Sequence, residues 1–217
     1  MLVDCGNVGA AVHSLARLAS LPSRHVQEAI ASVDISDLAD DDDPIKALPH
    51  RVGDVLDVRA GEVTQVRYYH ATRAVDPSSF RRNGLLPLGQ RLDRIWVELG
   101  DIASDDLSAK QFRELREAIE SGKGGDFGRL HRMKTNDALH HGPFGEYVRE
   151  YFLRSSALGT HDYLSMPEIL EDIALVAAQL YDIDLLDAYS AATRPYIVSF
   201  DMAVAGTDAA RQAVQAA

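Results

Sequence analysis

The most informative alternation of polar and apolar positions begins at Gln65, in the stretch QVRYYHATRAVDPSSFRRNGLLPL. Side chains along a β-strand point alternately to the two faces of the sheet, so Val66, Tyr68 and His70 would share one face. The pattern predicts a strand that ends at a polar pair, His70 and Thr72.

A short helix is predicted directly after this strand. Asp76 is a typical N-cap residue, and Pro77 suits the first helical position. The pair Asn83 and Gly84 provides a C-terminal cap before the chain returns to apolar residues at Leu85. The whole stretch therefore predicts a strand, a polar turn, a helix and a glycine stop.

Apolar residues recur at helical spacing in several other segments. Residues 7–20 and a second segment that begins at Ser23 predict a helical hairpin at the N-terminus. Further helices are predicted at 147–152, at 166–181 with Pro167 near its start, and after the N-cap Ser108 up to a stop at Gly122.

Two other segments bear on the number of strands. Residues 194–203, RPYIVSFDMA, alternate and predict a second clear strand. Residues 94–99, RIWVEL, are too few to distinguish a buried strand from a turn of helix. Trp96 lies in this segment, where a core position is favoured over stacking on a ligand.

The acidic run at residues 34–44, DISDLADDDDP, has the composition of a solvated linker. It divides the chain into a helical N-terminal extension with its linker at 1–44 and an α+β main domain at 45–217. The glycines at positions 6 and 9 lack the strand and the full glycine pattern of a nucleotide-binding loop. A loose N-terminal segment is expected there instead.

The amino-acid composition indicates the class of protein and the kinds of partner that it can bind. The chain has 217 residues, of which 46% are hydrophobic and 25% charged, as in an ordinary globular protein. With 33 acidic and 22 basic residues the net charge is -11, which disfavours a broad nucleic-acid surface and favours a small molecule or a protein as partner. No basic leader precedes the first apolar residues, and no run approaches about eighteen apolar residues. We therefore expect no membrane span and a cytoplasmic location.

The strand with His70-x-Thr72, followed by a helix that ends at Gly84 and Leu85, resembles the opening of the ADP-ribosyltransferase fold. This resemblance implies a small split β-sheet of the ADP-ribosyltransferase type. We therefore expect an α+β protein in which the N-terminal helical hairpin packs on that sheet. It also implies that His70 and Thr72 hydrogen-bond the nicotinamide end, or the adjoining ribose, of NAD. On the alternative interpretation, His70 is a half-buried strand histidine bonded to a backbone carbonyl, and Thr72 is a turn residue.

The family also has a catalytic glutamate before a late core strand. The best candidates here are Tyr163, which would stack on the nicotinamide, and Glu168, which would orient the ribose or activate an acceptor. This sequence departs from the family because Glu168 begins a predicted helix. The alternative is that Glu168 only complements a helix N-terminus and that Glu171 and Asp172 face solvent.

Two further sets of residues could bind charged groups. Arg73 is the arginine best placed for the pyrophosphate of NAD, although surface arginines also pair with acidic side chains. His131, His140, His141 and His161 do not have a recognisable zinc spacing, so no metal site is expected.

The predicted function is consumption of NAD, by an ADP-ribosyltransferase or an NAD glycohydrolase, in a role such as bacterial toxin or defence effector. NAD would be a substrate, and the acceptor, such as a protein, is unidentified. The competing prediction is a non-enzymatic protein-interaction module that uses an acidic helical surface. An enzyme acting on RNA ends is disfavoured by the net charge.

Overall fold

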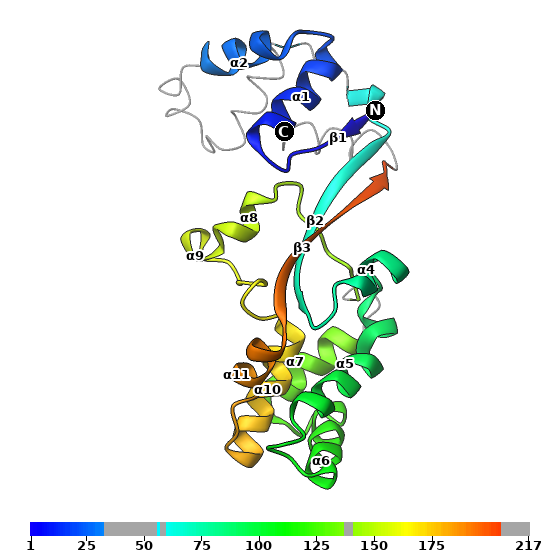
Figure 1. Ribbon diagram of the computed structural model, residues 1–217, viewed down its shortest axis with the longest axis vertical. Coiled ribbons are helices and arrows are strands. Elements are labelled where there is room, and N and C mark those ends of the chain that lie inside the picture. Colours follow the sequence, from blue (N-terminus) through cyan, green and yellow to red (C-terminus); the bar gives the residue numbers. More distant parts are fainter. Residues whose placement is uncertain (33–55, 57–59, 137–140, 205–217) are drawn as a thin grey trace. The chain divides into compact units, whose positions relative to one another are not determined.

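The computed structural model describes residues 1–32, 56, 60–136 and 141–204. Within them, one sheet has the strand order β1-β2-β3, formed by β1 (Leu2–Val3), β2 (Gln65–Ala74) and β3 (Arg194–Ala203) (Figure 1). The strand β1 runs parallel to β2, with Val3 opposite Val66. The two predicted strands are confirmed as β2 and β3, and the α+β class is confirmed. The ADP-ribosyltransferase type of sheet stays a prediction.

The contacts within the chain divide it into two units. The first unit comprises residues 1–69, 145–154 and those from 199 onward, and the second comprises 70–144 and 155–198. The predicted linker at 34–44 lies outside the described residues. The division differs from the predicted one, because the N-terminal helices share a unit with the beginning of β2 and the end of β3.

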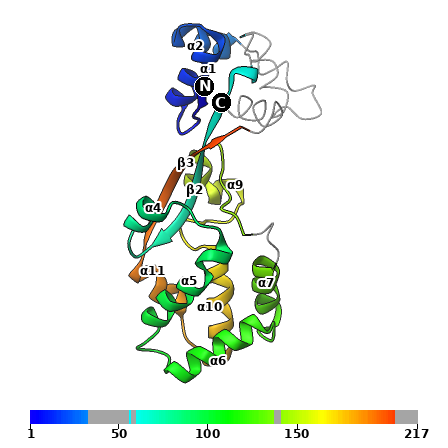
Figure 2. The same cartoon turned by 90° about the vertical axis from the view of Figure 1, so that its right-hand side faces the viewer.

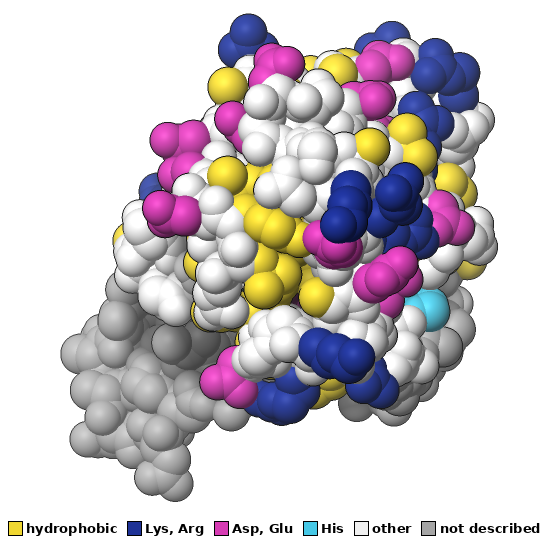
Figure 3. Space-filling model, turned by 90° about the horizontal axis from the view of Figure 1, so that it is seen from below, with side chains coloured by type: hydrophobic (Ala, Val, Ile, Leu, Met, Phe, Trp, Pro, Cys, Tyr) yellow, Lys and Arg dark blue, Asp and Glu magenta, His cyan; other side chains and the backbone are white. Residues whose placement is uncertain are grey.

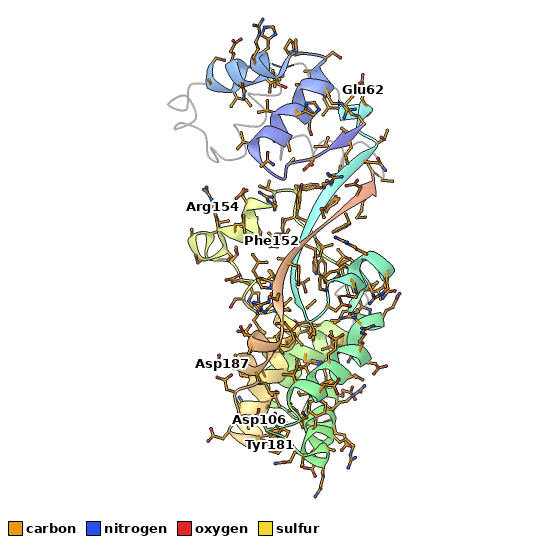
Figure 4. The ribbon with its side chains drawn as sticks, in the orientation of Figure 1. Glu62, Asp106, Phe152, Arg154, Tyr181 and Asp187 are labelled. Atoms are coloured by element: carbon orange, nitrogen blue, oxygen red, sulfur yellow. The ribbon has the colours of Figure 1, made fainter. Side chains whose placement is uncertain are left out.

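The first unit contains the predicted helical hairpin, formed by α1 (Val8–Ala19) and α2 (Ser23–Ser32). The Asn7 side chain caps α1 by accepting a hydrogen bond from the Ala10 amide at 3.0 Å. The prediction of a loose N-terminal segment is wrong. The strand β1 pairs with β2, and Val3 of β1 is fully buried against Val66. The same unit contains the short helices η2 (Ala60–Glu62) and α8 (Glu150–Leu153), and Phe152 of α8 is buried (Figure 4).

An arginine joins three segments of the first unit. Arg67 of β2 donates to both carboxylate oxygens of Asp201 on β3, at 2.7 and 2.9 Å, and to Asp4 at 3.1 Å. This bidentate geometry is the one that a guanidinium and a carboxylate prefer. Arg67 therefore pairs with acidic side chains, as the alternative interpretation of the arginines predicted.

The second unit is largely helical. Its helices are α4 (Ser78–Asn83), α5 (Leu88–Ile102), α6 (Ala109–Glu120), α7 (Gly125–Asn136), α9 (Ser155–Leu158), α10 (Glu168–Tyr181) and α11 (Leu185–Ala192). The helix α10 packs against α7, α6 and α11, and α5 packs against α11 and α6 (Figure 2). Trp96, Leu115 and Ile173 are fully buried in the core of this unit. Tyr181 lies at the end of α10 (Figure 4), and its hydroxyl donates to the Gln111 carbonyl at 3.2 Å.

The predicted N-cap of α6 and the predicted glycine stops are present in the second unit. Ser108 and Gln111 form a reciprocal capping box at the start of α6, and Gly122 ends the segment with a positive φ of 73°. Gly84, also at positive φ, ends α4 as predicted. The ambiguous segment 94–99 is part of α5, and Trp96 occupies the favoured core position with 1% of its surface exposed.

Among the described residues, no helix combines the length and the apolar character that crossing a bilayer requires.

Candidate functional site

The second unit contains a cavity of about 410 Å³. Its volume lies in the range of small-molecule sites, roughly 300 to 1,000 Å³. The cavity is lined by His70, Thr72 and Arg73 from β2, and by Tyr163 and Glu168 from a distant part of the chain. The fold thus brings all five predicted site residues to one cavity. Apolar and aromatic side chains form much of the rest of the lining, including Phe80, Ile95, Met133 and Phe144.

His70 occupies the cavity wall with a fixed ring orientation. Its Nδ1 lies 2.7 Å from the carbonyl oxygen of Phe144. A carbonyl can only accept a hydrogen bond, so Nδ1 bears the proton and Nε2 is left as an acceptor. Burial lowers the pKa of His70, although the bond to Phe144 opposes this shift, and the ring is therefore neutral at pH 7. His70 is both a half-buried strand histidine and a residue of the cavity.

Thr72 lies two positions further along β2, on the same face of the strand as His70. Its side chain is half-buried in the cavity wall. The hydroxyl makes no hydrogen bond to another described residue, so it can both donate to and accept from a ligand.

Arg73 is held by protein acceptors. Its guanidinium donates to the Thr193 side chain and to the carbonyls of Leu164 and Ser190 at 2.9 Å, and to the Thr193 carbonyl at 3.1 Å. These bonds occupy four of the five N–H groups of an arginine. Arg73 therefore joins β2 to the end of α11 and to the 164 segment, and it has little capacity left for a phosphate.

Arg91 is a cavity residue that the sequence did not single out. It lies in the first turns of α5, and its Nη2 is 3.6 Å from a carboxylate oxygen of Glu98. The other oxygen of Glu98 lies 3.0 Å from Arg94. Because Glu98 keeps a cationic partner if Arg91 moves, Arg91 is the more available arginine of the cavity.

Glu168 is the first residue of α10, and Pro167 precedes it at the N-cap position. The Tyr163 hydroxyl donates to Glu168 Oε1 at 2.8 Å, and Lys134 Nζ lies 3.2 Å from Oε2. Burial alone would raise the pKa of Glu168, but the Tyr163 hydrogen bond and the charge of Lys134 outweigh it and lower that pKa. Glu168 is accordingly an anion in the cavity wall at neutral pH.

Lys134 also lies 2.8 Å from Asp172 Oδ2, one helical turn beyond Glu168. Burial raises the pKa of Asp172 and the contact with Lys134 opposes this rise. The prediction that Asp172 faces solvent is wrong, because this residue is 5% exposed. The spacing of four residues between two acids on one helix was the sequence signal that they share a face.

The aromatic ring of Tyr163 is held in place by a contact with the ring of His161. The His161 ring packs edge-on against it, with 4.6 Å between ring centroids. His161 Nε2 lies 2.6 Å from the Met166 carbonyl, which fixes the histidine ring. Tyr163 is therefore oriented by both its hydroxyl and its ring.

Of the other histidines discussed above, His141 lines the cavity and His131 lies in the core. His131 is fully buried, and its ring centroid lies 6.2 Å from that of Trp96. His141 lines the cavity and bonds the Thr135 carbonyl through Nε2 at 2.9 Å. His140 lies outside the described residues. In the part of the chain that the structure describes, no three His, Cys, Asp or Glu side chains are grouped as metal ligands.

The cavity thus combines a neutral imidazole acceptor, a hydroxyl, an aromatic ring and a carboxylate in an apolar setting. Such a set suits a ligand with an amide or hydroxyl end next to a centre that develops positive charge. Comparisons of the chain with protein-family models, curated proteins and solved structures found no match.

Proposed function

We propose that the protein consumes NAD, as an ADP-ribosyltransferase or an NAD glycohydrolase. The observation that supports this most directly is the meeting of His70 and Thr72 with Tyr163 and Glu168 around one cavity. We infer that the substrate is NAD from the resemblance of the His70-x-Thr72 segment to ADP-ribosyltransferases. The role would be that of a bacterial toxin or defence effector.

The reaction would break the bond between ribose C1′ and the nicotinamide nitrogen. Nicotinamide leaves with the electron pair of that bond, and the ribose becomes cation-like. The anionic Glu168 would stabilise this positive charge as it develops, which is where a fixed carboxylate lowers the barrier most. Water or an acceptor group then forms a bond to C1′ and loses its proton, giving ADP-ribose or an ADP-ribosylated acceptor.

The nicotinamide end would bind beside β2. The Nε2 atom of His70 can accept from a carboxamide N–H or a ribose hydroxyl, and the Thr72 hydroxyl can donate to the carboxamide oxygen. Tyr163 would provide the aromatic surface against the nicotinamide ring. A neutral His70 suits this role, because an imidazolium would repel a positively charged nicotinamide.

The pyrophosphate would bind to Arg91 more readily than to Arg73. Four N–H groups of Arg73 already have protein acceptors. Arg91 has one long contact to Glu98, and an arginine suits bidentate binding to phosphate oxygens. We therefore reassign the phosphate-binding role that the sequence suggested for Arg73.

Release of nicotinamide from NAD tests this function. Glu168→Gln keeps the size of the side chain and removes its charge, so we expect release to fall by about 100-fold or more. His70→Ala should weaken NAD binding. Glu171→Gln is the matched control, because Glu171 lies on the same helix outside the cavity lining and should retain activity within about twofold. A wild-type protein that neither binds NAD nor releases nicotinamide would refute the proposal.

A further inference from the structure

We propose that Lys134 is a positioning residue that holds the Glu168 carboxylate toward the cavity, and that the buried Asp172 anchors Lys134 for this task. This inference rests on the proposed function only for its catalytic consequence. The arrangement of the three side chains is a property of the second unit in its own right.

Both oxygens of Glu168 have a donor. The Tyr163 hydroxyl bonds Oε1 and the Lys134 ammonium bonds Oε2, from two segments that flank the first turn of α10. A glutamate at the beginning of a helix, with 39% of its side chain exposed, would otherwise sample several rotamers. Two donors on opposite oxygens restrict it to one orientation.

Exposure decreases stepwise through the group, from 39% for the Glu168 side chain to 20% for Lys134 and 6% for Asp172. Asp172 is thus the buried end of the group, and both Glu168 and Lys134 line the cavity. The shorter contact, 2.8 Å, is the one to Asp172. The buried Asp172 therefore fixes Lys134, which in turn contacts the Glu168 carboxylate.

The charges explain why two acids accompany one lysine. A lysine paired with Glu168 alone would cancel the negative charge that a cation-like ribose requires. With Asp172 as a second partner, the three side chains keep a net charge of −1 when all are ionised. Glu168 and Lys134 both line the cavity, and Asp172 does not. Because Lys134 also pairs with Asp172, it does not fully cancel the negative charge of Glu168 at the cavity.

The other groups near Glu168 agree with this arrangement. Tyr163 and Lys134 lower its pKa, and His161 adds a smaller effect in the same direction. Glu171, the next acid on α10, lies 3.8 Å from His161, so it acts on that histidine. Lys134 is the cation in direct contact with Glu168 among the described residues.

The experiment compares wild type with the double variant Lys134→Met/Asp172→Asn. Removing Lys134 alone would leave Asp172 buried without its cation, and such a variant can fail to fold. The double variant leaves no unpaired buried charge. Lys110→Met is the matched control, because Lys110 pairs with Glu114 in an exposed i,i+4 contact on α6.

Two measurements are made on each protein. Carboxyl ¹³C NMR follows the titration of Glu168, whose resonance is identified by its absence in Glu168→Gln. Nicotinamide release is measured from pH 5 to pH 9. In the double variant we expect the Glu168 midpoint to move to higher pH and turnover to fall by about 10- to 100-fold near neutral pH, as for a misplaced catalytic group. The acid limb of the activity profile should move with the NMR midpoint.

An unchanged midpoint and an unchanged pH profile in the double variant would overturn the role of Lys134. The NMR titration needs no turnover, so it decides this point even if the wild type proves inactive on NAD. In that case the proposed function fails and the positioning of Glu168 by Lys134 stands or falls on its own measurement. A purely structural role would lower stability without moving either pH dependence.

Discussion

At the scale of single residues, the hydroxyl of Tyr163 can be separated from its ring. Tyr163→Phe keeps the aromatic surface and removes the donor to Glu168 Oε1. Loss of a donor to the ionised form raises the pKa of Glu168. We expect NAD binding within about threefold of wild type, turnover lower by about tenfold, and an acid limb at higher pH. Steady-state kinetics across pH measure all three. A variant that loses binding but keeps turnover per bound substrate would contradict this role.

His131 gives the second unit a predictable sensitivity to acid. Burial lowers its pKa from 6.5 to about 4, and neither ring nitrogen has a hydrogen-bond partner among the described residues. Well above pH 6.5 the ring is neutral in both the folded and the unfolded state. As the pH falls toward 4, the unfolded state binds a proton that the folded state does not, and the free energy of unfolding falls by about 3 kcal/mol.

The variant His131→Leu removes this titration. We expect its free energy of unfolding, measured by urea at pH 7 and pH 4.5, to depend less on pH than that of wild type. His25→Leu, at an exposed position on α2, is the control and should keep the wild-type dependence. Equal pH dependence in His131→Leu and wild type would show that His131 is not the group that titrates.

The residues of the cavity differ in how far their place in its lining could be predicted from the sequence. His70 and Thr72 belong to a local pattern, and Tyr163 and Glu168 lie close together in the chain, so each pair could be selected as a candidate without a structure. Lys134 could not be found, because its partners lie on another helix and nothing near it in sequence indicates them. The engagement of Arg73 by carbonyl groups likewise depends on tertiary contacts.

At the scale of elements, the approach of α7 to α10 depends on a glycine. A Cβ at Gly124 would lie 2.9 Å from both methyl groups of Val176 on α10. Gly124→Ala should therefore push α7 away and reduce the free energy of unfolding by about 1 to 3 kcal/mol. Since α7 contains Lys134, this variant should also raise the midpoint of the Glu168 titration.

Gly128→Ala is the matched variant within α7. Its Cβ would meet no atom closer than 3.7 Å, and alanine is the better helix former. We expect a gain of about 0.5 to 1 kcal/mol in the free energy of unfolding, measured by urea titration. Equal losses in the two variants would contradict the account of close packing at Gly124.

The elements themselves followed their local signals where those signals were strong. The alternation in β2 and β3, the Gly84 stop of α4, the capping box of α6, and Pro167 before α10 each specified an element that the structure contains. The N-terminal end of α4 differs by one residue, because Pro77 occupies the N-cap position that was predicted for Asp76. The strand β1 was missed because two residues give no periodicity, and its pairing with β2 is a long-range contact. The segment 94–99 was ambiguous in isolation and is helical as part of the longer α5.

At the scale of the whole molecule, the net charge and its distribution bear on whether the partner is a small ligand or a nucleic acid. On the face shown in Figure 3, basic and acidic side chains are interspersed around a group of apolar ones. A net charge of -11 with this distribution favours a small anionic ligand at a local site over a nucleic acid along a surface. The cavity in the second unit, with Arg91 in its lining, is the place where we propose that such a ligand binds.

Calorimetric titration with NAD tests the central claim, that this cavity binds a dinucleotide through His70. We expect wild type to bind NAD with a dissociation constant between about 1 μM and 1 mM. His70→Ala should weaken binding by about tenfold or more, and the surface variant His25→Ala should leave it unchanged. Absence of binding to wild type, or equal binding to wild type and folded His70→Ala, would contradict it.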